Sequence, residues 1–239
     1  MTPAILLTRP EGDSAEVAAA LRARLDAPRI EIAPVLRIAF ADAMPPMEGV
    51  GGLIFTSRNG VRAWQALGGP VLPCYCVGEA TADLARAEGV QAVSAAGNVS
   101  DLADRIVTDR PGGHWMHLHG AHVRGALVNR LRAAGLTASS AVLYRQDEVA
   151  LTAEARRLLA APGPVVLPVY SPRSAALIVA QAAGILRAPV FAAAISPHVQ
   201  TALSPLRWTK CAIAGRPDAD AMLETTIDQY HAALDGSAG

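Results

Sequence analysis

Short apolar runs alternate with amphipathic stretches along the whole chain. Each run has the length of a β-strand, and most are followed by a turn signal and then by helical periodicity. Strands are predicted over residues 4–7, 52–55, 74–77, 114–118, 165–169, 191–195 and 211–214. Helices are predicted over residues 14–25, 81–89 and 125–135, the first capped by Ser14 or Asp13 and the others ended by glycines. This alternation predicts an α/β protein with parallel sheets covered by helices on both faces.

A weak internal repeat indicates two similar lobes. FTSRNGV (55–61) resembles VYSPRSA (169–175), VGEATA (77–82) corresponds to ISPHVQ (195–200), and SDL (100–102) corresponds to DAM (220–222). Two extended stretches, 31–40 and 141–147, break the rhythm and are predicted to be linker strands between the lobes. We therefore expect one domain from residues 1–35 and 148–239, and a second from residues 36–147 that includes the linker strands.

Polar residues gather where predicted strands lead into helices. A helix N-terminus offers free N–H groups and a partial positive charge, which suit a carboxylate. For any single Ser or Thr, plain N-capping is the simpler interpretation. As a set, facing one cleft between the lobes, the candidate binding residues are Thr8, Arg9, Thr56, Ser57, Arg58, Asn59, Gly78, Thr81, Gly120, Arg124, Ser171, Arg173, Ser174, Ser196 and His198.

Composition and missing motifs narrow the function further. The formal net charge is zero and the pI is about 7.0, so a nucleic-acid partner is not expected. With no signal-peptide pattern and no apolar stretch of about 20 residues, we expect a cytoplasmic protein that does not bind membranes. The cysteines Cys74, Cys76 and Cys211 fit buried, reduced thiols. Phosphate-binding, dinucleotide-binding and nucleophile-elbow motifs are absent from the sequence.

Histidines crowd one segment at His114, His117, His119 and His122. Strand alternation puts His117 and His119 on the same side, but no further ligand lies near in sequence, so we expect no metal site. A polar strand end, or carboxylate binding by His119 or His122, remains open. Tyr144 in the second linker stretch is either a packed aromatic residue or a phenol that donates a proton to a leaving hydroxyl.

Several segments, taken in order, resemble the uroporphyrinogen-III synthase family. They are ILLTRPEGDS (5–14), IFTSRNGV (54–61), VGEATA (77–82), GNVSDL (97–102), VLYR (142–145) and YSPRS (170–174). The resemblance implies two flavodoxin-like, Rossmann-like lobes joined by a two-stranded linker. The sequence departs from the family's pattern at Val199. The family commonly has Gly-x-x-Thr here, so valine stands in place of the threonine, and His198 is the residue before it.

The resemblance also implies a function. The family's members are hydro-lyases that dehydrate hydroxymethylbilane and close it to uroporphyrinogen III with ring D inverted, in heme biosynthesis. The implied partner is this linear tetrapyrrole octacarboxylate, no cofactor is required, and we expect a monomer. Tyr144 and Thr81 would match the family's functional Tyr and Thr, and Thr56, Ser57 and Ser171 would contact carboxylates. The rival interpretations are a two-lobe small-molecule binding protein and an inactive synthase homologue.

Overall fold

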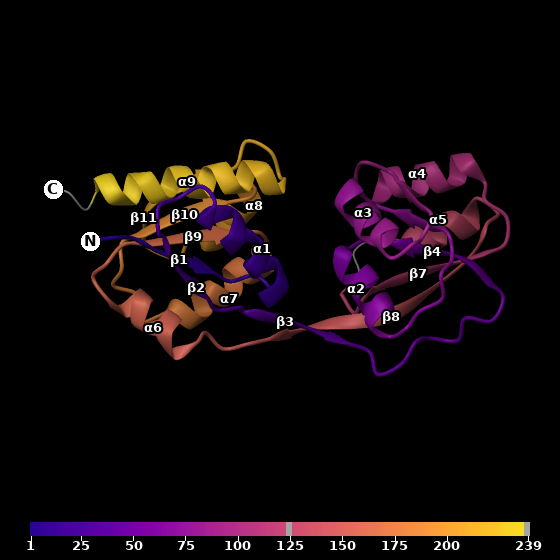
Figure 1. The fold of residues 1–239 in the computed structure, drawn as a ribbon, viewed down its shortest axis with the longest axis horizontal. Helices are drawn as coiled ribbons and strands as arrows, with labels where there is room; N and C mark the ends of the chain where they lie inside the picture. Colours follow the sequence, from indigo (N-terminus) through magenta and orange to yellow (C-terminus); the bar gives the residue numbers. More distant parts are fainter. Residues whose placement is uncertain (123–125, 237–239) are drawn as a thin grey trace. The chain divides into compact units, whose positions relative to one another are not determined.

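The computed structural model describes residues 1–122 and 126–236. The chain divides into two compact units: unit 1 is Met1–Arg37 with Asp147–Gly239, and unit 2 is Ile38–Gln146. The chain passes from one unit to the other twice, along β3 (Leu36–Phe40) and along β8 (Thr137–Glu148) (Figure 1). Unit 2 is therefore an insertion into unit 1.

Unit 1 is built on a five-stranded parallel sheet. The spatial order is β11-β10-β9-β1-β2, with β1 (Ala4–Leu7), β2 (Arg29–Ile32), β9 (Val165–Val169), β10 (Val190–Ala194) and β11 (Trp208–Ile213). Counted along unit 1 alone, this is the order 2-1-3-4-5 of flavodoxin-like folds. The order reverses between β1 and β9, which are direct neighbours.

Helices cover both faces of this sheet. α1 (Glu11–Arg22) and α9 (Ala219–Asp235) pack on Ile5, Leu7 and Val166. α6 (Ala153–Ala160), α7 (Pro172–Ala182) and α8 (Pro197–Leu203) pack on Leu6 and Leu167. Figure 1 shows α9 and the pair α6 and α7 on opposite sides of the strands. Because both faces are covered, the strands are almost continuously apolar.

Unit 2 has a six-stranded sheet in the order β3-β8-β7-β4-β5-β6. β4 (Val50–Phe55), β5 (Cys74–Cys76), β6 (Ala92–Ser94), β7 (His114–Gly120) and β8 are parallel. β3 runs antiparallel to β8, since Ala41 N donates to Leu143 O and Val149 N to Val35 O. α2 (Arg58–Ala66) and α3 (Glu79–Ala87) cover one face, and α4 (Val99–Asp109) and α5 (Leu127–Ala133) cover the other. The strand order reverses between β4 and β7. The predicted class, α/β with parallel sheets, is confirmed.

The internal repeat is confirmed by matching helix caps. Ser57 begins α2 as Ser171 begins α7, and Gly78 begins α3 as Ser196 begins α8. At the third pair, Asn98 caps α4 and Asp218 caps α9, two residues before the aligned triplets. The repeat thus preserves strand, cap and helix in the same register.

Two predictions about elements were wrong, those for the first linker strand and for the cap of α1. The linker strand expected over 31–40 is two strands, because β2 pairs with β1 and Pro34, which has no N–H, separates it from β3. The linker strand expected over 141–147 is confirmed as the second part of the longer β8, which crosses between the units and whose first part belongs to the unit 2 sheet. α1 begins at Glu11 after Pro10, so Ser14 and Asp13 lie inside the helix and do not cap it. β6 escaped prediction because it has only three residues.

The cysteines divide into two kinds. Cys74 and Cys76 are buried and free, as expected for reduced thiols. Cys211 is also free but only half-buried, because it lies on the edge strand β11, which has a single neighbour.

Replacing Gly52 with alanine is expected to destabilise unit 2. An added Cβ at Gly52 would lie 2.4 Å from the Trp115 ring, whereas at the adjacent Gly51 the nearest atom would be 3.9 Å away. Because overpacking a buried site typically costs about 1–3 kcal/mol, we expect Gly52→Ala to lower the free energy of unfolding by that amount. Urea unfolding of Gly52→Ala and of the control Gly51→Ala tests this, and equal midpoints would refute the packing argument.

Candidate functional site

The strand-order reversal in unit 2 brings two polar side chains together. β4 and β7 are parallel neighbours, with Ile54 paired with His117 and Phe55 with Leu118, so both strands end at the same edge of the sheet. Thr56 follows β4 directly, and its Oγ1 lies 3.0 Å from Nε2 of His117. Open parallel sheets bind ligands at this kind of position, where the strand order reverses.

His117 is almost completely buried, with an exposed fraction of 2%. Burial, and to a smaller extent the nearby His119, lower the pKa of His117 to about 3. The imidazole is therefore neutral at ordinary pH, with one ring nitrogen as donor and the other as acceptor. A neutral ring can hold the Thr56 hydroxyl without placing a charge in the core.

A bulge in β8, opposite the end of β7, sets the direction of Tyr144. His119 pairs with Val142 but Gly120 pairs with Tyr144, so β8 has one extra residue at this point. Leu143 and Tyr144 consequently pack in the same core cluster. A Cβ on Gly120 would lie 2.7 Å from the Tyr144 ring, so only glycine permits this packing. Tyr144 is 8% exposed, and no described residue hydrogen-bonds its hydroxyl.

The N-termini of α2 and α3 lie at the same edge of unit 2. The Ser57 side chain accepts a hydrogen bond from Asn59 N, so the plain capping role is present at this residue. Gly78 begins α3, and Thr81 is buried within its first turn, so the expectation that Thr81 is a cap was wrong. Arg58 begins α2 and is half-buried.

Unit 1 has an equivalent polar group where its strand order reverses. Thr8 and Arg9 follow β1, and Tyr170 follows β9, the neighbouring strand. The Arg9 guanidinium lies 4.3 Å from the centre of the Tyr170 ring and forms an ion pair with Asp13 at 2.8 Å. Thr8 is buried. Burial raises the pKa of the Tyr170 hydroxyl. The Arg9 cation is thus held at the edge where parallel sheets of this kind commonly bind ligands.

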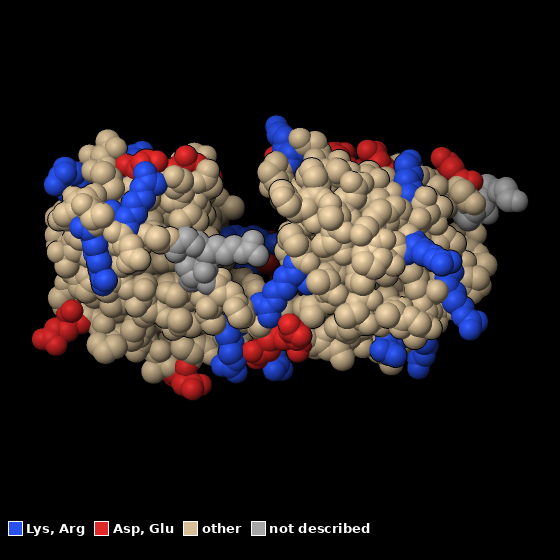
Figure 2. Space-filling view, turned by 180° about the vertical axis from the view of Figure 1, so that it is seen from behind, with Lys and Arg blue, Asp and Glu red and all other residues tan. Residues whose placement is uncertain are grey.

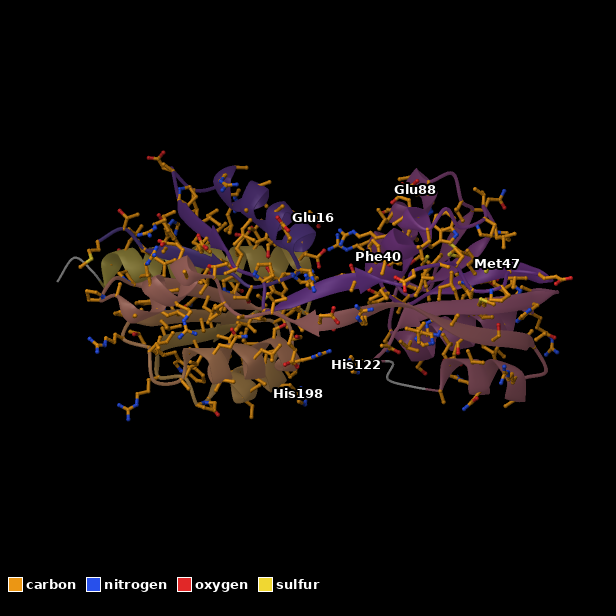
Figure 3. The ribbon with its side chains drawn as sticks, turned by 90° about the horizontal axis from the view of Figure 1, so that it is seen from below. Glu16, Phe40, Met47, Glu88, His122 and His198 are labelled. Atoms are coloured by element: carbon orange, nitrogen blue, oxygen red, sulfur yellow. The ribbon has the colours of Figure 1, made fainter. Side chains whose placement is uncertain are left out.

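Two further helices begin at this edge of unit 1. The Ser171 Oγ accepts a hydrogen bond from Ser174 N and donates one to Ser174 Oγ. The Ser196 Oγ accepts from Val199 N at 3.4 Å. Arg173 lies 3.6 Å from Glu148. His198 is exposed at the start of α8 (Figure 3).

Position 199 is buried in this chain. Val199 is fully buried in the core against α7, which accounts for an apolar residue there. Its place in α8 is that of Thr81 in α3, three residues after the residue that begins the helix.

Sequence reasoning missed Tyr170 and the bulge at Gly120. Tyr170 stands one residue before the cap Ser171, the position that Thr56 has before Ser57, so the repeat gave a signal for it. Arg124 lies outside the described residues. His122 follows β7 and is exposed, and within residues 1–122 and 126–236 no three His, Cys, Asp or Glu side chains are grouped as a metal site requires.

Charged side chains do not gather into a large patch on the face of the molecule that Figure 2 shows. On the face in Figure 2, basic and acidic side chains are scattered singly or in small groups over both units. Within the part of the chain that the structure describes, no helix is long and apolar enough to cross a membrane. Because the formal net charge is zero, an anionic ligand is expected to be bound by local groups such as helix N-termini and Arg9.

These features define a class: a two-unit α/β protein whose parallel sheets each present polar side chains and helix N-termini where the strand order reverses. A family model described as "Uroporphyrinogen-III synthase HemD" matches residues 15–224. The chain belongs to the uroporphyrinogen-III synthase family. No curated protein sequence matches the chain.

Solved structures share the fold at low identity. Uroporphyrinogen-III synthetase from Helicobacter pylori 26695 is 16% identical, covers 95% of this chain and 99% of its own, and has a TM-score of 0.66. A mutant uroporphyrinogen III synthase from Thermus thermophilus is also 16% identical, covers 98% and 99%, and has a TM-score of 0.49. At this identity the Helicobacter likeness supports the fold, and the Thermus score is too low to add to it.

His117 is expected to make folding sensitive to acid. Its pKa of about 3 in the folded state lies below the ordinary value of about 6.5. As pH falls, His117 therefore takes up a proton in the unfolded chain before it does so in the folded chain. The stability that the neutral ring contributes is present above pH 6.5 and is lost as pH falls. His117→Gln should lower the dependence of unfolding free energy on pH by up to about 1.4 kcal/mol per pH unit between pH 6 and 4. Urea unfolding across this range tests it. The exposed His231→Gln is the control, and equal slopes in His117→Gln and wild type would contradict burial of a neutral ring.

Proposed function

We propose that this chain removes water from hydroxymethylbilane and closes it to uroporphyrinogen III with inversion of ring D. Family membership over residues 15–224 is the observation that carries the reaction. The same match does not favour a periplasmic-type binding protein. The polar groups at the strand-order reversal of each unit support an enzyme that binds a polyanionic substrate.

Carboxylate binding is assigned to helix N-termini and their neighbours. In unit 2 the groups are the backbone N–H donors that begin α2 and α3, with Thr56, Ser57, Arg58, Asn59 and Gly78. In unit 1 they are those that begin α7 and α8, with Thr8, Arg9, Ser171, Arg173, Ser174, Ser196 and His198. Several helix N-termini suit a substrate with many carboxylates, because backbone N–H groups can bind an anion without a buried, unpaired cationic side chain.

Tyr144 is assigned to the leaving hydroxyl. The C–O bond of the hydroxymethyl group breaks, the phenol donates a hydrogen bond or a proton to the departing oxygen, and water leaves. Loss of water leaves an azafulvene, which the substituted carbon of ring D attacks to form a spiro-pyrrolenine intermediate. This intermediate rearranges, and the macrocycle then closes with loss of a proton. Tyr144 suits this role because its hydroxyl has no partner among the described residues.

Control of conformation is the main catalytic contribution in this proposal. The bilane must be held so that ring D turns before the ends meet, and binding energy at the carboxylates can supply that restraint. The reaction as written consumes no redox equivalent and needs no cofactor. We further infer that the protein acts as a monomer in the cytoplasm, with the linear tetrapyrrole as its partner.

The purified protein is expected to convert hydroxymethylbilane mainly to the type III isomer. Without an enzyme the bilane closes to the type I isomer, so the ratio of isomers reports control by the protein. Freshly prepared substrate, oxidation of the products and chromatographic separation give the ratio. A ratio equal to that of the reaction without protein would overturn the assignment and favour an inactive homologue.

Tyr144→Phe is expected to lower kcat about tenfold, below the roughly 10²–10⁴-fold typical of a full general acid, because conformational control dominates. The control is Tyr75→Phe in β5, which removes a hydroxyl that already donates a hydrogen bond to Asp109 of α4. Steady-state kinetics should separate the two variants, and unchanged kcat in Tyr144→Phe would remove Tyr144 from the mechanism.

A further inference from the structure

Two histidines at the end of β7 lie between the residues assigned to substrate binding and to dehydration. His117 and His119 are two positions apart on one strand, so both side chains point to the same face of the sheet. Their ring centres are 4.8 Å apart. Nε2 of His117 lies 3.0 Å from the Thr56 hydroxyl, and Nδ1 of His119 lies 2.8 Å from the Gly120 carbonyl oxygen.

The His119 contact fixes its tautomer. A carbonyl oxygen only accepts hydrogen bonds, so Nδ1 of His119 must carry the proton that it donates. Gly120 is the residue at which the ladder between β7 and β8 shifts register. Beyond the shift, Ala121 N donates to Tyr144 O at 2.9 Å. The His119 hydrogen bond therefore restrains the peptide next to which the Tyr144 ring packs.

We propose that His117 and His119 are positioning residues: His117 orients the Thr56 hydroxyl, and His119 stabilises the bulge at Gly120 that directs Tyr144. The inference rests on the proposed function for the consequence of these contacts, but not for their existence. A contiguous series of contacts thus joins Thr56, His117, His119, Gly120 and Tyr144 across the ends of β4, β7 and β8.

Burial strengthens the assignment of His117. A polar ring that is 2% exposed costs free energy unless it is hydrogen-bonded, and Thr56 provides the bond. Burial also lowers the pKa of His117, so the ring acts as a neutral hydrogen-bonding group. A metal-binding role has no support, because among the described residues no third ligand is grouped with this pair.

Asparagine and glutamine distinguish the two contacts. The asparagine amide reaches about as far as the Nδ1 atom of histidine, and the glutamine amide about as far as Nε2. His117→Gln and His119→Asn should therefore retain their hydrogen bonds, whereas His117→Asn and His119→Gln should lose them. A role limited to side-chain size or polarity would rank Asn and Gln alike at both positions.

The expected kinetic effects also differ between the two positions. His117→Asn should raise KM about three- to tenfold, because Thr56 loses its partner. His119→Gln should lower kcat by a similar factor, because Tyr144 is no longer held in place. These factors correspond to the loss of one hydrogen bond of ordinary strength. The matched variants His117→Gln and His119→Asn should stay within about twofold of wild type. In a Tyr144→Phe background, His119→Gln should lower kcat no further. The same ranking of Asn and Gln at both positions, or additive losses in the double variant, would overturn the proposal.

A measurement on the unmodified protein keeps the test independent of variant folding and of activity. Histidine ¹⁵N NMR of the full chain should show the Nδ1–H tautomer at His119. The hydrogen bond to the Gly120 carbonyl oxygen should slow the exchange of this Nδ1 proton with water. An Nε2–H tautomer at His119 would overturn the proposal. A wild-type protein that gave only the type I isomer would instead refute the proposed function, while the NMR result would still establish whether this contact exists.

Discussion

The parallel pairing of two central strands is the constraint on which the rest of each unit depends. β4 pairs with β7 in unit 2, and β1 pairs with β9 in unit 1. At both pairs the covering helices change from one face of the sheet to the other, so the strand ends are not closed over by the same helix layer. Side chains that follow these strands therefore meet each other at an edge where helix N-termini also lie.

Close packing at this edge requires small residues at defined places. A Cβ on Gly60 of α2 would lie 3.0 Å from the Leu118 carbonyl oxygen of β7, and one on Gly120 would meet the Tyr144 ring. The absence of a side chain lets the helix start and the aromatic ring approach the end of β7. The apolar sheet below holds them there, since Phe55 and Leu118 are fully buried. The polar residues at this edge are thus packed directly against a buried, close-packed core.

The candidate residues of each unit combine bonded polar groups with a few available ones. Thr56, Ser57 and Ser171 already have hydrogen-bond partners, so their first role is structural and their hydroxyls are oriented before any ligand binds. The Tyr144 hydroxyl differs because it has no partner among the described residues. Arg9 is held by Tyr170 and Asp13 yet stays partly exposed. Preorganised groups of this kind lose little entropy when a carboxylate arrives.

The sequence by itself predicted the α/β class, most of the strands, the repeat and the junctions where strands lead into helices. Strand-length apolar runs and a serine before a helix are local signals, so Ser57, Ser171 and Ser196 were placed correctly at helix starts. Local signals failed where the backbone responds to distant partners. The stretch around Pro34 divides into β2 and β3 because β2 pairs with β1, a strand that is distant in sequence. Thr81 is buried in the core and does not cap α3.

Only the tertiary structure decided which junctions meet. The contact of Thr56 with His117 spans 61 positions in sequence, and that of Arg9 with Tyr170 spans a whole inserted unit. The bulge that turns Tyr144 toward the Gly120 side arises from the register between β7 and β8, and a shift of one residue reverses the face to which a side chain points. Strand register and the low pKa of a buried histidine both depend on surroundings assembled from distant segments, so no local pattern encodes them.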